Sequence, residues 1–236
     1  MEITLIASGS RPWELWFGYW GLSYLLDETI LFDTFANYCV LARKLRRSKV
    51  DLSKIKAVVL SHDHWDHTGG LWGFLKEHRG MRVYLPPSAR ESSKRRVADL
   101  GGHLLAAHEM KTLKENILLP DEMIGSFNGK AIAEQFIVIK AEKGLVVLVG
   151  CSHPGIVSIV KRAKELFGAP IYGVIGGLHL MHATTQEVYA CAEALKNEGV
   201  SLIAPTHCTG RIAELTFKKV FGEGYVPMRE GQMVSL

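Results

Sequence analysis

Hydrophobic and polar positions follow two different periods along this chain. Short apolar runs rich in β-branched residues predict buried strands, and segments with apolar residues spaced three or four apart predict helices. The predicted strands are 2–7, 22–26, 29–33, 56–61 and 82–85 in the first half, and 136–141, 145–150, 171–176 and 201–206 in the second. The predicted helices are 37–47, 70–79, 88–99, 155–167, 185–198 and 209–220.

The alternating elements indicate an α/β fold. No linker rich in Pro, Gly or Ser divides the pattern, so a single domain over residues 1–236 is expected, with stacked sheets and helices outside them. Two predicted strands run into the same dipeptide, at Ser61-His62 and Ser152-His153. The repeated dipeptide is either a coincidence or the sign of two equivalent halves whose strand ends converge on one site.

Composition and charge narrow the class of protein. The chain is 47% hydrophobic and 22% charged, as in ordinary globular proteins, and its net charge of +4 is mild. The basic runs at 43–47 and 94–96 are interpreted as solvated helix faces. No apolar run reaches the roughly 18 residues of a membrane span, and the first residues do not resemble a signal peptide. The four cysteines form no CxxC pair, so reduced thiols and a cytoplasmic location are expected.

The densest chemistry follows the strand that ends near residue 60. Residues 62–67 hold three histidines and two aspartates. Side chains alternate on an extended backbone, so His62, His64 and Asp66 are expected to share one face. His67 breaks this alternation, which requires that the strand has ended. The motif therefore offers one pair of ligands, His62 with His64, and a second pair, Asp66 with His67.

Imidazoles together with a carboxylate suit Zn(II), Fe(II) or Mn(II). A polar surface loop is the alternative, but three histidines within six residues argue against it. Two pairs of ligands do not complete two metal sites, so further donors must come from elsewhere. The candidates stand at the ends of other apolar runs: Cys151, His153, His179, His207 and Cys208. For His179, a substrate contact or a hydrogen bond to a ligand is favoured over metal ligation.

These motifs carry a family resemblance. The segment "SHDHWDH" matches the HxHxDH signature of the metallo-β-lactamase superfamily, and "LFDT" at 31–34 matches its earlier aspartate motif. More narrowly, these segments and "GCSHPG", "GGLHL" and "PTHCTG" are similar to the subgroup of 7,8-dihydropterin-6-yl-methyl-4-(β-D-ribofuranosyl)aminobenzene 5′-phosphate synthases. The resemblance implies a four-layer αββα sandwich with a dinuclear metal site at one edge of the two sheets.

The resemblance also implies roles for individual residues. His62 and His64 would bind one metal ion, whereas Asp66 and His67 would bind the other, which His207 would complete. Asp66 would in addition steer a hydroxide that bridges the metals. Two divalent ions per chain are expected, with Zn favoured over Mn and Fe.

The chain departs from the superfamily pattern in two places. The superfamily brings a histidine in a turn where this chain has "AEQFIV", and no histidine lies between 120 and 145. His153 is the natural substitute for that ligand. Gly150-Cys151 stands where a bridging Asp would follow a glycine, so Cys151 is either a bridging or nearby thiolate or a packed thiol. Asp33, at a strand end, is expected to orient one of the metal-binding histidines.

A metal-dependent hydrolase that uses a metal-bridged hydroxide is the preferred function. Its substrate would be a small molecule that bears a phosphate or an ester, with a pterin-like ring as one choice. An iron-dependent redox enzyme, a nuclease and a non-enzymatic metal-bound interaction module remain as alternatives. The modest charge disfavours the nuclease, and neither a nucleic acid nor a membrane is expected as a partner.

The segment 11–21, "RPWELWFGYWG", raises a separate question. It holds three tryptophans, a phenylalanine and a tyrosine within eight residues of a loop-like stretch. Three interpretations are open: a hydrophobic plug under a sheet end, a flat aromatic wall for a ring-bearing substrate, and a contact between copies in a homo-oligomer.

Overall fold

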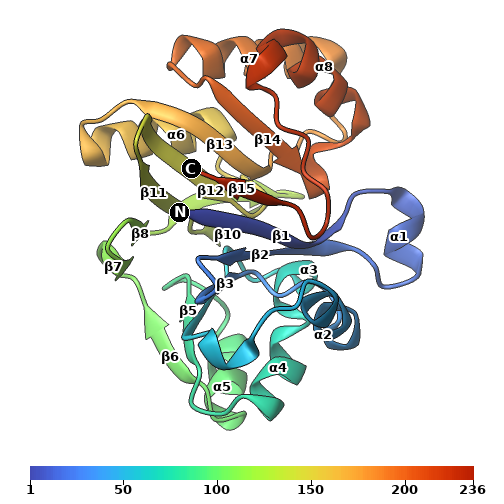
Figure 1. The fold of residues 1–236 in the computed structure, drawn as a ribbon, viewed down its shortest axis with the longest axis vertical. Helices are drawn as coiled ribbons and strands as arrows, with labels where there is room; N and C mark the ends of the chain where they lie inside the picture. Colours follow the sequence, from blue (N-terminus) through green and yellow to red (C-terminus); the bar gives the residue numbers. More distant parts are fainter. The chain divides into compact units, whose positions relative to one another are not determined.

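The computed structural model describes residues 1–236, apart from the side chain of Pro12. The chain forms two compact units (Figure 1): Met1–Glu109 with Arg229–Leu236, and Met110–Met228. Each unit has its own large sheet and its own apolar core. The expectation of one domain over 1–236 stays a prediction.

The first unit is built on a seven-stranded sheet with the order β15-β1-β2-β3-β4-β5-β6. Its strands are β1 (Glu2–Gly9), β2 (Gly21–Leu26), β3 (Ile30–Phe32), β4 (Ala57–Val59), β5 (Arg82–Leu85), β6 (His103–Ala106) and β15 (Met233–Ser235). Its helices are α1 (Pro12–Trp16), α2 (Tyr38–Arg47), η1 (Leu52–Lys54), α3 (Trp65–Thr68), α4 (Leu71–Glu77) and α5 (Glu91–Asp99). Strands β3 to β6 are parallel, because helices connect each of them to the next.

Helices α2, α4 and α5, seen in Figure 1, contribute apolar residues to the core of the first unit together with its strands. Leu45, Phe74 and Val97, one from each helix, are fully buried with Leu31 of β3 and Val58 of β4. The strands and helices that frame the loop after β4 are therefore firmly packed, and this loop carries the histidine motif.

The second unit is built on a six-stranded sheet with the order β14-β13-β12-β11-β8-β7, and a separate two-stranded sheet pairs β9 with β10. Its strands are β7 (Lys111–Lys114), β8 (Ile117–Leu119), β9 (Met123–Phe127), β10 (Lys130–Glu134), β11 (Ile137–Ala141), β12 (Gly144–Val149), β13 (Ile171–Gly177) and β14 (Leu202–Thr206). Its helices are α6 (Ile156–Phe167), α7 (Thr185–Asn197), η2 (His207–Thr209), α8 (Arg211–Phe221) and η3 (Gly222–Gly224).

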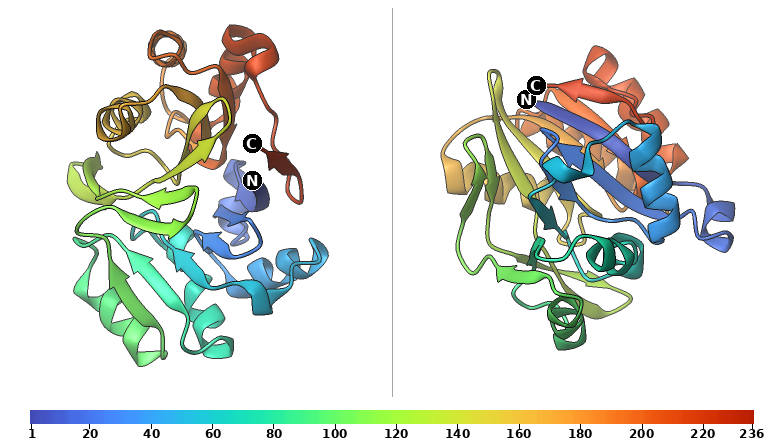
Figure 2. Two further views of the ribbon diagram at one scale, coloured as in Figure 1. Left: turned by 60° about the vertical axis from the view of Figure 1, so that its left-hand side comes forward. Right: turned by 60° about the horizontal axis from the view of Figure 1, so that its bottom comes forward.

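Strands β12, β13 and β14 run parallel, with α6 and α7 as the connections between them. Apolar residues of α6, α7 and α8 pack with these strands into one core. Figure 2 shows these helices, coloured orange to red, from two further sides. Since parallel strands end at the same edge of a sheet, the segments that follow β12, β13 and β14 are brought together.

The predicted strands and helices are all present, with ends that differ by a few residues. The sequence pattern missed α1, α3, β6 to β10 and β15, which are short. Strands β7 and β9 are also largely half-buried or exposed, so their sequences lack a continuous apolar run. Among the described residues, no helix has the length and apolar character needed to cross a bilayer.

Candidate metal centre

The HxHxDH motif of the first unit spans a loop and a short helix. Strand β4 ends at Val59, and α3 begins at Trp65 with His64 as the residue before its first turn. Asp66 and His67 therefore lie in a helix, so the prediction that His62, His64 and Asp66 alternate along an extended strand was wrong. His62, His64, Asp66 and His67 are here called the histidine cluster.

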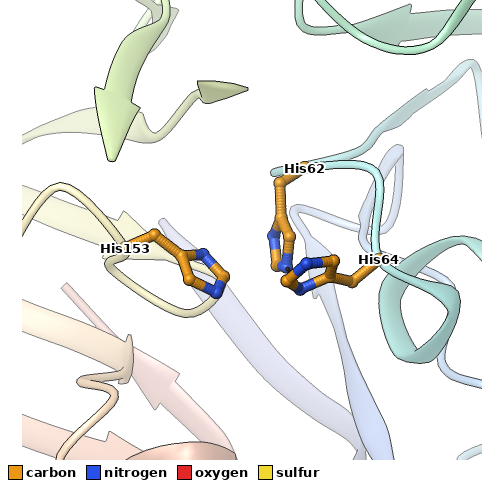
Figure 3. Close-up of side chains that lie close together, drawn as sticks. All are labelled: His62, His64 and His153. Carbon is orange, nitrogen blue, oxygen red and sulfur yellow. Dashed lines mark hydrogen bonds between the residues drawn. The ribbon is translucent and has the colours of Figure 1, made fainter. Parts of the chain in front are cut away.

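The histidine cluster brings its donor atoms together in two pairs. Nε2 of His62 and Nδ1 of His64 lie 3.0 Å apart (Figure 3). Oδ2 of Asp66 and Nε2 of His67 lie 3.6 Å apart. Two donors that share a tetrahedral Zn ion at about 2.0–2.1 Å are separated by about 3.4 Å. The spacing within each pair therefore fits a shared metal ion.

Asp33, which follows β3, organises this cluster. Its side chain is fully buried, and Oδ1 accepts a hydrogen bond from the backbone N–H of Ser61 over 2.7 Å. Oδ2 accepts one hydrogen bond from the hydroxyl of Ser61 over 2.7 Å and another from Nδ1 of His67 over 2.6 Å. Because a carboxylate only accepts, Nδ1 of His67 carries the proton and Nε2 keeps the lone pair that a metal ion needs.

Ser61 extends the same control to His62. The hydroxyl of Ser61 donates to Asp33, so its oxygen is left to accept a hydrogen bond from Nδ1 of His62, 2.8 Å away. The Nε2 atom of His62, which faces His64, therefore also keeps its lone pair. One buried carboxylate thus sets the tautomers of two histidines.

The second unit carries another group of donors at the ends of its parallel strands. Hydrogen bonds hold these ends together: the Ser152 hydroxyl donates to the carbonyl of Gly177, and the N–H of Leu178 donates to the hydroxyl of Thr209. The donors form what is here called the cysteine–histidine cluster: Cys151, His153, His179, His207 and Cys208.

Two triads of donor atoms lie within the cysteine–histidine cluster, each with all its atoms inside 4.8 Å of one another. One triad is Cys151, His153 and His179, and the other is Cys151, His207 and Cys208. His207 is fully buried, whereas His179 is exposed. The structure therefore gathers the donors that the sequence placed at three separate strand ends.

Glu134, at the end of β10, was missed by the sequence analysis. Its buried carboxylate accepts the backbone N–H groups of Cys151, Ser152 and His153 over 2.8–2.9 Å. It also accepts Nδ1 of His153 over 2.7 Å, which leaves the Nε2 lone pair of His153 for a metal ion. The signal was an acidic residue shortly before a buried strand, in the segment "AEQFIV" that replaces the expected histidine turn.

The backbone at these strand ends adopts an unfavourable conformation. Asp33, Ser152, His179 and His207 have φ values of 59°, 64°, 53° and 51°, in the left-handed region that non-glycine residues rarely occupy. Such a conformation costs about 1–3 kcal/mol per residue and persists only where the surroundings enforce it. Its recurrence next to both clusters indicates that the loops are shaped to place specific side chains.

The two buried thiols of the second unit influence each other. Burial raises the pKa of the Cys208 thiol, but the hydrogen bonds to Cys151 and His179 and the charge of His207 outweigh it. The pKa of Cys208 consequently lies well below the ordinary thiol value.

The aromatic segment 11–21 forms the short helix α1 and its flanking turns. Trp16 and Phe17 are 87% and 71% exposed, and Trp13 is 52% exposed. The interpretation of these side chains as a hydrophobic plug was therefore wrong. The aromatic wall and the contact between copies stay predictions.

The sequence model of the metallo-β-lactamase superfamily matches residues 21–207, a span that holds the histidine cluster and all of the cysteine–histidine cluster except Cys208. The chain belongs to the metallo-β-lactamase superfamily, whose members typically bind divalent metals. The predicted α/β fold of this type is confirmed, with its two large sheets and helices.

Individual relatives agree with this assignment. The chain is 31% identical to the 7,8-dihydropterin-6-methyl-4-(β-D-ribofuranosyl)-aminobenzene-5′-phosphate synthase of Methanocaldococcus jannaschii, over 91% of this chain and 89% of the relative. It matches the crystal structure of a metal-dependent hydrolase of the β-lactamase superfamily with a TM-score of 0.80 and 26% identity, over 100% and 99% of the two chains. A diphosphatase of the PhnP family shares the fold at a TM-score of 0.62 and 15% identity, over 100% and 97%.

Proposed function

We propose that this protein is a metal-dependent hydrolase that binds two divalent ions. The proposed ligands are His62, His64, Asp66 and His67 in the first unit and His153 and His207 in the second, with His153 and His207 serving different ions. The observation that carries the proposal is the pair of buried carboxylates, Asp33 and Glu134. Each fixes a histidine tautomer that presents Nε2, which is the form that metal coordination needs.

The donor chemistry supports divalent ions of the Zn type. Neutral imidazoles with a single carboxylate, Asp66, bind Zn(II), Fe(II) and Mn(II), and the thiols nearby favour Zn and Fe. Two such ions would polarise a substrate oxygen and lower the pKa of a bound water to about 7. A nucleophile is then present at neutral pH without a Ser-His-Asp triad.

The protein's own side chains would orient the reactants. Asp66 is 7% exposed, so its carboxylate can hold an attacking water in one direction by accepting a hydrogen bond. His179 is exposed and its ring centroid lies 4.6 Å from that of His153. His179 would contact the substrate, which is one of the two roles that the sequence analysis favoured, and in this proposal it also donates a proton to the leaving group.

The substrate proposed is a small molecule that bears a phosphate or an ester. The solved structure that shares the fold is named as a diphosphatase. The Methanocaldococcus relative is named for a product that carries a 5′-phosphate. Phe127, 38% exposed, places its ring centroid 5.6 Å from that of His179 and offers an apolar surface to a ring-bearing substrate.

A screen of the zinc-loaded protein against phosphomonoesters, phosphodiesters, lactones and thioesters tests the proposal. We expect hydrolysis of at least one class, its loss on chelation, and its loss in Asp66→Asn. Asp51→Asn, at an exposed carboxylate that caps η1, is the matched control and should retain activity. Hydrolysis that survives chelation and Asp66→Asn would contradict the proposal.

A second candidate function is the synthesis for which the methanogen relative is named. The 31% identity over 91% of this chain favours it. Incubation of the metal-loaded protein with a 6-hydroxymethyl-dihydropterin activated as its diphosphate ester and a ribofuranosylaminobenzene 5′-phosphate, followed by mass spectrometry for the joined product and released diphosphate, distinguishes the two. Formation of the joined product without hydrolysis of any ester class would favour the synthase.

A further inference from the structure

We infer that Cys151 is a thiolate ligand shared by both metal ions, so that the centre contains sulfur. The inference rests on the proposed function and adds a ligand and a metal preference to it. It decides between the two alternatives that the sequence left open for Cys151, a thiolate near the metals and a packed thiol.

The position of Cys151 within the second unit supports a shared ligand. Its sulfur lies inside 4.8 Å of the donor atoms of His153 and His179, and also of those of His207 and Cys208. Among the described residues of this unit, Cys151 is the one member common to both triads. His153 and His207 are the proposed ligands of different ions, so the shared thiol stands where a bridge between them is needed.

The backbone holds Cys151 firmly in this position. Its N–H donates to Oε1 of Glu134 over 2.9 Å, and its carbonyl oxygen lies 3.8 Å from the sulfur of Cys208. Gly177 of the neighbouring strand approaches so closely that an added Cβ would meet the carbonyl of Gly150 at 2.3 Å. The thiol is therefore preorganised, as a metal ligand should be.

Comparison with Cys191 argues against a packed thiol. Cys191 packs against the apolar core of this unit, and burial raises its pKa to about 11. Cys151 is only 3% exposed, yet it does not belong to that core. Its sulfur lies among imidazoles and a second thiol, which are groups that coordinate or hydrogen-bond rather than pack.

A shared thiolate has a chemical consequence for metal choice. Binding requires that the Cys151 thiol releases its proton to solvent, after which one sulfur lone pair is donated to each ion. Soft thiolate ligands select Zn, Fe and Co over Mn and Mg. The protein should therefore take up Zn(II) or Co(II) from an equimolar mixture with Mn(II).

Cobalt substitution tests the inference by a readout other than activity. Co(II) bound by a thiolate shows an intense near-ultraviolet charge-transfer absorption, which histidine and carboxylate ligands do not give. We expect this band in the wild-type protein at two cobalt ions per chain, and its loss in Cys151→Ser. Cys191→Ser and Cys39→Ser, at thiols outside the cluster, are the matched controls and should keep the band.

Two further variants keep the test decisive. Cys208→Ser should keep the band, because Cys208 belongs to one triad only. Cys151→Asp should lose the band but keep both cobalt ions, since a carboxylate can also bridge two metals. Circular dichroism and thermal unfolding of each variant establish that it is folded.

The outcomes separate this inference from the proposed function. If wild-type protein binds cobalt without the band, Cys151 is not a ligand, but the proposed metal centre stands. If the band disappears in Cys208→Ser and persists in Cys151→Ser, the wrong cysteine has been assigned. If the protein binds neither cobalt nor zinc, both the inference and the proposed function are wrong.

Discussion

Oε2 of Glu134 and Nδ1 of His153 are joined by a buried 2.7 Å hydrogen bond, and the same carboxylate accepts three successive backbone N–H groups. Asp33 and His67 form the corresponding bond of 2.6 Å in the other unit. In both units a Ser-His sequence follows a buried strand, and a carboxylate accepts the N–H of that serine. In each unit a buried carboxylate therefore orients an imidazole donor, although Asp33 bonds His67 and not the His62 that follows Ser61.

Replacement of Glu134 tests whether its carboxylate orients His153 for metal binding. In Glu134→Gln the amide NH2 must face at least one N–H donor, so His153 loses its orientation. We expect zinc affinity to fall about 10–100-fold, as for other groups that orient a metal ligand. Competition with a chromophoric chelator measures it, and Glu142→Gln, in an exposed turn, should behave like wild type. An unchanged affinity would show that Glu134 is only structural.

Replacement of Asp33 tests whether its carboxylate orients His67 and, through Ser61, His62. Asp33→Asn should also lower zinc affinity about 10–100-fold, because it disturbs His67 directly and His62 through Ser61. The same competition experiment measures the change, with Asp51→Asn as the exposed control. Full zinc binding by Asp33→Asn, with only its thermal stability lowered, would contradict this role.

His153 and His179 are expected to differ in their effects. His153→Ala should lose most of the bound metal and the activity, whereas His179→Ala should retain the metal and lower turnover or substrate affinity. Elemental analysis and steady-state kinetics of the two variants measure this difference. Metal loss confined to His179→Ala would show that the two roles are exchanged.

Close packing of Gly177 predicts that a residue without a donor atom of its own affects the cysteine–histidine cluster. An added Cβ would meet the Gly150 carbonyl at 2.3 Å and the Cys208 sulfur at 2.7 Å. Gly177→Ala should therefore cost about 1–3 kcal/mol of stability, which is a fall of several degrees in Tm, and it should reduce metal content. Gly173→Ala in the same strand meets only side-chain atoms at 3.2 Å and beyond, so it should be milder. Equal losses of stability and metal in the two variants would show that the close backbone contact of Gly177 is not the cause.

Much of the fold followed from the sequence because its strands and helices are strongly periodic. The elements that escaped are short or half-exposed, such as β7 and β9, where burial does not impose a hydrophobic pattern. The left-handed backbone at Asp33 and Ser152 also left no local signal, since each conformation is enforced by hydrogen bonds to residues distant in the chain.

The candidate donors followed from their residue types, because histidines that follow strands are conspicuous. Their partners did not. Glu134 lies 19 residues before His153, and only the folded chain shows that the two side chains meet. The helix α3 was also missed, because its four residues are too few to show a helical period. Local sequence indicates donor chemistry, whereas the groups that orient the donors depend on tertiary structure.

The metal content of the wild-type protein, purified without chelators, tests the central claim most directly. Elemental analysis should find about two divalent ions per chain, mostly zinc, with histidine, aspartate and cysteine donors that suit that metal. Removal of the metal ions with a chelator should abolish activity, and added zinc should restore both the metal content and the activity. A content well below one ion per chain, which neither zinc, manganese nor iron can raise, would contradict the account.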